Sequence, residues 1–267
     1  MTQRYATGDD WGTAGDWNPA AVPITDDEAF FGEDSPAMTG TMDQGGVDLD
    51  LLYLHRLFRY NLGASGAPLK IAADLLVMKG AGALYYECSA GGAGLKTDLA
   101  RIACENKDTV VQLGSETGDA GDFDNIEILR GNVLCAANIA FGASCELQTG
   151  HMGNVVGDVA LTIAEDADTL PVLTVRGGTV VSNGPVTLAK LYAGITTQDK
   201  AAMTAAHVYN GATLIYNHTA GTITVWPGGI LDISRTAEQK TLTIYRYEGS
   251  IVRPYDASLH TITETWY

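Results

Sequence analysis

Short apolar runs recur from about Leu69 to the end of the chain, separated by glycine, asparagine, aspartate, serine and threonine. Most runs are four to six residues long and rich in β-branched side chains, which is typical of strands rather than helices. The runs are LLVM (75–78), VVQL (110–113), IEIL (126–129), VALTI (159–163), VLTV (172–175), VTLAKL (186–191), TLIY (213–216), TITV (222–225) and TLTIY (241–245). The pattern therefore predicts an all-β fold.

Two interleaved series of related segments repeat in the last third of the chain. One series begins at Gly211, Gly229 and Gly249, and the other, TITV, TLTI and TITE, begins at Thr222, Thr241 and Thr261. The offsets are 18 and 20 residues in the first series and 19 and 20 in the second. About twenty residues form one coil of a parallel β-helix, in which each short strand stacks on its equivalent in the next coil. The repeat predicts a right-handed parallel β-helix of about ten coils over residues 47–267. An antiparallel sandwich or barrel is the alternative, since it also joins short strands by glycine turns.

Three segments depart from this regular pattern. Residues 195–208 have alanine, methionine and lysine in a helix-tolerant order, so we expect a loop or short helix there. Residues 47–62 alternate as a strand up to Arg56, after which we expect irregular chain. Residues 1–46 have no strand period, and their glycine, proline, aspartate and threonine content predicts an extended N-terminal arm.

Composition and charge narrow the classes of partner. The chain has 267 residues, 46% of them hydrophobic, and a formal net charge of −16. Such acidity without a basic patch argues against nucleic acid as a partner. We find no cationic leader followed by an apolar run, and no apolar run of the 18 or so residues that a bilayer span needs. We therefore expect no membrane association and synthesis in a cytosol.

The four cysteines lack the close spacing of a zinc or redox motif. We expect them to be reduced and to fill the core as small hydrophobic side chains. They are Cys88, Cys104, Cys135 and Cys145.

The stretch WGTAGDWNPAAVPITDDEAFF (11–31) concentrates large aromatic side chains in the predicted arm. An extended arm cannot bury Trp11, Trp17, Phe30 and Phe31 by itself. It needs a surface, which is either the first coil of its own β-helix, whose open end must be covered, or a neighbouring subunit.

At the motif level this opening resembles a family of tailed-phage proteins predicted to be β-helical. The resemblance covers Trp11 to Gly82, and LHRLFRYNL is bulkier and more basic than the turn usual at that place. Its elements here are Trp17-Asn18, Val22-Pro23, Asp26-Asp27 before Ala29 to Phe31, and Met42-Asp43-Gln44. Family members are similar to virion structural proteins, in particular trimeric head decorations and fibre-like appendages.

The resemblance implies a structural protein of a tailed bacteriophage, most simply a trimeric capsid decoration or cement protein. It would be made in the host cytoplasm and lie on the outer capsid surface as a homotrimer, with the major capsid protein as partner. The expected contact residues, for the capsid or a neighbouring subunit, are Trp11, Trp17, Pro19, Val22, Pro23, Phe30 and Phe31. The alternative is a tail fibre or tailspike that binds or degrades a host surface glycan, and a bacterial adhesin is a third class.

The residues that could carry chemistry favour no enzyme. The acidic clusters Asp26-Asp27-Glu28, Asp122 with Asp124, and Glu165-Asp166 with Asp168 are expected as solvated turns in so acidic a chain. Residues 115–125 have closely spaced oxygen ligands, so calcium is a minor alternative there, but they lack the fixed pattern of a calcium loop. The five histidines are scattered. We expect no catalytic site, no metal and no cofactor.

Aromatic residues gather late in the chain. Aromatic rings with a polar group suit lateral stacks on a β-helix wall, a protein interface or a sugar-binding face. The residues are Tyr209, Tyr216, Tyr245, Tyr247, Tyr255 and Tyr267, with Trp226 and Trp266.

Overall fold

The computed structural model describes residues 1–40, 42–88, 95–114, 122–150, 158–218, 220–234, 239–253 and 261–267. Apart from one short 3-10 turn, the regular structure of these residues is β-strand, which confirms the all-β prediction. The chain divides into two compact units, Met1–Cys145 and Glu146–Tyr267. The division differs from the boundary after residue 46 that the sequence predicts.

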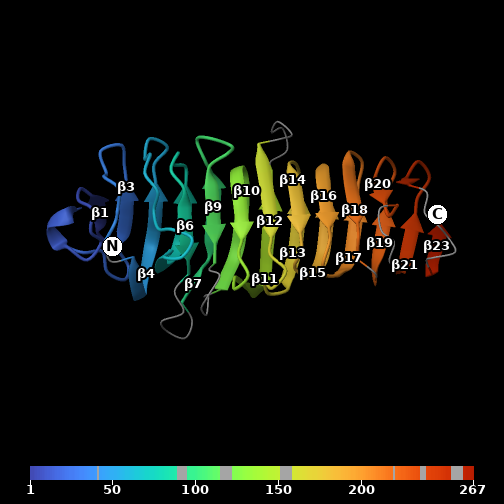
Figure 1. The fold of residues 1–267 in the computed structure, drawn as a ribbon, viewed down its shortest axis with the longest axis horizontal. Helices are drawn as coiled ribbons and strands as arrows, with labels where there is room; N and C mark the ends of the chain where they lie inside the picture. Colours follow the sequence, from blue (N-terminus) through green and yellow to red (C-terminus); the bar gives the residue numbers. More distant parts are fainter. Residues whose placement is uncertain are drawn as a thin grey trace. The chain divides into compact units, whose positions relative to one another are not determined.

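The first unit is built from parallel strands that lie next to one another in Figure 1. Strand β3 pairs with β4, β4 with β5, β5 with β8 and β8 with β10, all parallel. The elements are β1 (Gln3–Ala6), the 3-10 turn η1 (Ala14–Asp16), β2 (Trp17–Asn18), β3 (Glu28–Phe31), β4 (Asp43–Leu54), β5 (Leu69–Met78), β6 (Leu84–Glu87), β7 (Lys96–Thr97), β8 (Leu99–Ala103), β9 (Val110–Leu113) and β10 (Asp122–Cys135). Strand β11 (Ala140–Thr149) contains the boundary between the units.

The second unit consists of two interleaved parallel ladders, because each strand pairs with the strand two places later in sequence. The first ladder follows β11 with β13 (Leu170–Val175), β15 (Val186–Leu191), β17 (Met203–Val208), β19 (Ala220–Val225), β21 (Thr241–Arg246) and β23 (Thr261–Trp266). The second contains β12 (Val159–Ile163), β14 (Thr179–Ser182), β16 (Gly194–Gln198), β18 (Ala212–Tyr216), β20 (Ile230–Asp232) and β22 (Ile251–Val252). Figure 1 shows the second unit from yellow to red, with its strands side by side in chain order.

The register of the first ladder defines the repeat of the second unit. The paired residues in successive strands are Val172, Leu188, Ala205, Thr222, Thr243 and Thr263. Their spacings are 16, 17, 17, 21 and 20 residues. A repeat near the predicted length is therefore present, but it is shorter in the earlier strands, which explains why it is hard to see there in the sequence.

One predicted register is shifted by two residues. The sequence series aligns Thr222 with Thr241, whereas in the structure Thr222 lies opposite Thr243. The next interval, Thr241 opposite Thr261, is as predicted. A shift of two residues keeps every side chain on the same face of a strand, so the inward and outward pattern does not distinguish these registers.

Alternation along the strands produces the core. In β18, Leu214 and Tyr216 are buried while Thr213 and Ile215 between them are half-buried. All nine apolar runs identified in the sequence lie in strands, and residues 47–54 form the end of β4, followed by irregular chain, as expected.

The segment 195–208 is an error of the sequence interpretation. It forms most of β16 and all of β17 rather than a loop or short helix. Met203, Ala206 and Val208 are buried against the strands on either side, so burial in the ladder overrides the helix preference of alanine and methionine.

The predicted extended arm is also absent as a separate element. Strand β1 pairs parallel with β3, which in turn pairs parallel with β4. Residues 1–46 therefore belong to the first unit and cover its first long strand. The physical reason is the one weighed above, since the aromatic payload of this segment needs a surface and finds it in its own unit.

Positive backbone φ angles mark corners of the second unit that only glycine occupies easily. Gly194 has φ of 82° and Gly211 has φ of 89°. A β-carbon on Gly194 would lie 2.4 Å from the carbonyl oxygen of Gly178, whereas one on Gly211 would meet nothing closer than 3.7 Å. Gly194 is thus constrained by both conformation and space.

All four cysteines are free and buried, as predicted. Burial raises the pKa of Cys88 and of Cys104 to about 12, so both thiols stay protonated near neutral pH. Among the described residues, no helix is long and apolar enough to cross a bilayer.

Candidate functional site: an aromatic column on the second unit

Five aromatic residues stand in register at the ends of successive strands of the first ladder. Because Leu191 lies opposite Val208 and Val208 opposite Val225, the residues that follow them also face one another. The same holds after Arg246 and Trp266. The aromatic column consists of Tyr192, Tyr209, Trp226, Tyr247 and Tyr267.

The rings of the aromatic column are stacked face to face. The ring centroids are 4.6 Å apart from Tyr192 to Tyr209, 5.7 Å to Trp226, 4.4 Å to Tyr247 and 5.1 Å to Tyr267. The angles between successive ring planes are 4°, 7°, 12° and 20°. The strand spacing of about 4.8 Å sets these distances, so parallel in-register pairing is what builds the column.

Polar groups complete the column. The guanidinium of Arg176 lies 5.6 Å from the ring centroid of Tyr192, a cation–π contact at that end. The indole Nε1–H of Trp226 donates to Nδ1 of His207 at 3.4 Å. Burial, and then the charge of Lys190, lower the pKa of His207, which keeps its imidazole neutral and able to accept this bond at pH 7.

The stacking limits what the aromatic column can bind. A sugar packs on the flat face of an aromatic ring, but the inner rings of the column have both faces against neighbouring rings. What they present to solvent is ring edges and hydroxyl groups. The geometry therefore suits lateral stabilisation of the strands, worth about 0.5–1.5 kcal/mol per pair, better than a sugar platform.

Not all late aromatic residues join this surface. Tyr216 is buried in the core, where its hydroxyl donates to the carbonyl of Ala220 and burial raises its pKa to about 12. Tyr245 lies beside Tyr267, with ring centroids 6.2 Å apart. Trp266 is 61% exposed, with the Arg246 guanidinium 4.0 Å from its ring centroid. Tyr255 lies outside the described residues.

Three of the seven predicted partner-binding residues are buried inside the first unit. Trp11, Trp17 and Phe31 form one cluster, with ring centroids 4.9 to 5.8 Å apart, and Phe58 packs on Phe31 at 5.3 Å. The indole of Trp17 donates to the backbone carbonyl of Trp11 at 3.0 Å. The prediction that these three side chains face a partner is therefore wrong for this structure, because the first unit buries them itself.

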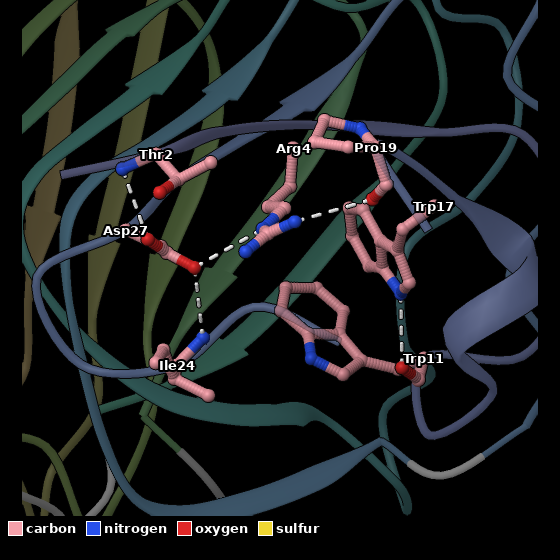
Figure 2. A network of polar contacts seen from close by, with 7 residues as sticks. All are labelled: Thr2, Arg4, Trp11, Trp17, Pro19, Ile24 and Asp27. Atoms are coloured by element: carbon pink, nitrogen blue, oxygen red, sulfur yellow. Dashed lines mark hydrogen bonds and ion pairs between the residues drawn. The ribbon is translucent and has the colours of Figure 1, made fainter. Parts of the chain in front are cut away.

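A buried carboxylate holds the opening segment against this cluster. Figure 2 shows Asp27 accepting hydrogen bonds from the backbone N–H of Thr2, from that of Ile24 and from Nε of Arg4. The Arg4 guanidinium also donates to the carbonyl of Pro19 at 3.3 Å. Burial alone would raise the pKa of Asp27, but these hydrogen bonds and the charge of Arg4 outweigh it and lower the pKa.

The other four predicted residues are placed differently. Pro23 is buried, Pro19 is exposed, and Val22 and Phe30 are half-buried. The Phe30 ring stacks on Tyr5 at 5.0 Å and lies 5.8 Å from Tyr53, so these three make an outward aromatic stack. This stack is a surface of the first unit that the sequence indicated only through Phe30.

The first unit also has a column of carboxylates that sequence reasoning missed. The register places Asp50 opposite Asp74, Asp74 opposite Asp98, and Asp98 opposite Asp124. Burial, and then the charges of Asp98 and Asp50, raise the pKa of Asp74. Lys96 relieves part of the repulsion by bridging Asp98 and Asp124. The signal in the sequence was the even spacing of single aspartates, which we read as isolated turns.

The remaining candidates do not converge on one site. Asp26 and Glu28 border Asp27, while Asp122 and Asp124 lie on β10, and Glu165, Asp166 and Asp168 lie in the exposed turn before β13 or beside it. Residues 115–121, with most of the calcium candidate, lie outside the described residues. Over the described ranges, no three His, Cys, Asp or Glu side chains come together as metal ligands would.

Comparisons with protein families, with curated proteins and with solved structures found no match to this chain.

Proposed function

We propose that the chain is a structural protein of a tailed-phage virion, folded as a right-handed parallel β-helix and acting by binding rather than by chemistry. The two interleaved ladders of the second unit and their repeat of 16 to 21 residues support the β-helix. The right hand follows the usual hand of crossovers between parallel strands. The resemblance of the opening segment to tailed-phage proteins supports the virion.

The aromatic column is the observation that carries a structural role. Its ring faces contact one another, so the most conspicuous row of exposed side chains stabilises the fold instead of waiting for a ligand. Charged groups are likewise paired internally, as in Arg4 with Asp27, Arg246 with Glu264 and Arg253 with Asp232. A stiff body of this kind suits a protein that reinforces a shell.

Within this proposal the chain is a homotrimeric decoration or cement protein on the outer capsid surface, and the major capsid protein is its partner. The contact with the capsid uses the exposed opening residues Pro19 and Val22 and the outward stack around Phe30. The buried residues Trp11, Trp17 and Phe31 shape that surface from below.

Copy number on purified particles tests the proposal. A decoration protein is expected in hundreds of copies per head, measured by quantitative mass spectrometry against the major capsid protein. Particles that lack the protein should bind it when it is added back, and Phe30→Asp should weaken binding at least tenfold, while Thr204→Asp on the second unit should not. A handful of copies confined to the tail, or none on particles, would contradict the proposal.

A tail fibre or tailspike that binds host surface glycan is the second candidate. The observation in its favour is Trp266, whose ring is 61% exposed and covered on one side by Arg246. An exposed indole face is what a sugar ring packs against. Binding of host surface polysaccharide in calorimetry, abolished by Trp266→Ala and unaffected by Tyr192→Ala, would favour this candidate.

A further inference from the structure

The second ladder of the second unit has a flat outer face made only of small and β-branched side chains. Strands β14, β16, β18, β20 and β22 alternate strictly, so Val180, Leu214 and Leu231 point into the core. The side chains between them point outward in two in-register columns. We name these the isoleucine-threonine face: Thr179, Ile195, Thr213, Ile230 and Ile251 in one column, and Val181, Thr197 and Ile215 in the other.

The isoleucine-threonine face leaves large apolar side chains in water. Ile195 is 47% exposed and Ile251 is 50% exposed, and Ile230 between them is half-buried. Isolated apolar residues on a surface are ordinary, but these three recur at equivalent positions of parallel strands. The ladder therefore presents a continuous apolar stripe.

Charge distinguishes this face from the rest of the chain. Residues 1–145 contain 21 acidic and 9 basic residues, a net charge of −12, whereas residues 146–267 contain 11 and 7, a net charge of −4. None of the eight residues of the isoleucine-threonine face is charged. Two copies of this acidic chain repel each other over most of their surface, and an uncharged face is where they can approach without that cost.

The border of the face has the polarity of an interface rim. The residues after β14, β16 and β18 are Asn183, Asp199 and Asn217, and Asn217 donates a hydrogen bond to Asp199 at 3.2 Å. An apolar centre with a polar, solvated edge is the anatomy of protein–protein interfaces.

We propose that the isoleucine-threonine face is the surface through which copies of this chain associate with one another, leaving the acidic first unit free of the contact. This inference rests on the proposed function for the homotrimer and adds the face that forms it. A symmetric contact lets the same in-register stripe of one copy pack against that of the next. A partner of different chemistry, such as a basic protein, would be expected to dock on a charged surface instead.

Sedimentation velocity of the purified full chain at micromolar concentrations tests the inference. The wild type is expected to associate, and Ile195→Lys combined with Ile251→Lys is expected to weaken association at least tenfold, because it places like charges in facing stripes. The matched control, Thr204→Lys with Thr241→Lys, puts two lysines at exposed strand positions of the other ladder and is expected to associate as the wild type does. Circular dichroism checks that each variant is folded.

A milder variant guards against misfolding of the lysine variant. Ile195→Thr with Ile251→Thr keeps the β-branched shape and removes the apolar contact, so it is expected to weaken association several-fold. A wild type that stays monomeric, or lysine and threonine variants that associate as strongly as the wild type, would overturn the inference. These outcomes are separate from the particle test, since a chain can be abundant on heads and associate through another face.

Discussion

The two units pair their strands in the same parallel way but place their aromatic and acidic side chains on opposite sides. The first unit buries Trp11, Trp17 and Phe31 and has a column of aspartates on its surface. The second unit exposes a column of tyrosines with Trp226 and has no aspartate in the outward columns of its second ladder. In-register pairing repeats the same position about every 4.8 Å, so it multiplies whichever interaction that position makes.

The comparison explains why a single residue type has different effects in the two units. Stacked rings attract, so the aromatic column adds stability with each strand. Stacked carboxylates repel, so the aspartate column weakens the first unit unless a cation such as Lys96 intervenes. We expect the stability of the first unit to depend on pH and salt, and that of the second to depend on ring contacts.

The largest effect is expected from the buried aromatic cluster. Phe31→Ala removes a fully buried ring that touches Trp11, Trp17 and Phe58 and should lower the free energy of unfolding by about 3–5 kcal/mol. The neighbour Phe30 stacks outward on Tyr5, so Phe30→Ala should cost only about 1 kcal/mol. Urea denaturation measures both, and equal losses would contradict the assignment of inside and outside.

The next effect concerns a corner of the second unit. Gly194→Ala forces a side chain into a φ of 82° and against the carbonyl of Gly178, so it should cost about 2 kcal/mol. Gly177 has open space and no positive φ, so Gly177→Ala should change stability by less than about 0.5 kcal/mol. Thermal unfolding of the two variants compares them, and an unchanged Gly194 variant would argue against the register at that corner.

Removing one ring from the aromatic column should have a smaller effect. Tyr209 stacks on both Tyr192 and Trp226, so Tyr209→Ala should cost about 1 kcal/mol. Tyr209→Phe keeps the ring and should be close to neutral. Near-ultraviolet circular dichroism should lose intensity in the alanine variant only. The same loss in the phenylalanine variant would mean that hydroxyl bonds, not stacking, hold the column.

The smallest effect is a pH dependence with opposite signs at two carboxylates. The pKa of Asp74 is raised, so its stabilising contribution belongs to the protonated form and is lost as pH rises through the folded pKa. Acidification from pH 7 toward the model value of 3.8 should therefore stabilise the first unit, and Asp74→Asn should remove part of this dependence. Added salt should act in the same direction at pH 7.

Asp27 has the opposite sign. Its pKa is lowered, so the stability from its hydrogen bonds is present above 3.8 and is lost as pH falls through the folded pKa. Asp27→Asn should abolish this acid-induced loss. Melting temperatures measured between pH 2 and 7 separate the two windows, and a monotonic rise of stability with pH in wild type and Asp74→Asn alike would contradict the aspartate column.

The sequence predicts strands better than it predicts their neighbours. Every apolar run lies in a strand because alternation with β-branched residues is local information. Residues 195–208 were misread because alanine and methionine favour helices until two ladders bury them. The register at Thr222 was misjudged by two residues because face alternation is unchanged by that shift.

The candidate site was harder to predict because it depends on register. The tyrosines near the end of the chain were recognised as a group, but only pairing shows that Tyr209 stacks on Trp226 while Tyr216 is buried. For the same reason, Trp17 and Phe31 could not be assigned to their own unit or to a partner from sequence, since both outcomes bury an aromatic arm equally well.

Cross-linking of engineered cysteines tests the in-register stacking of parallel strands most directly. Opposed residues of adjacent strands have the α-carbon separation of about 5 Å that a disulfide accepts, whereas residues two positions out of register are too far apart. The structure pairs Thr222 with Thr243, so Thr222→Cys with Thr243→Cys should form an intramolecular disulfide readily, and Thr222→Cys with Thr241→Cys should not. A disulfide only in the second pair, or in neither, would contradict the account.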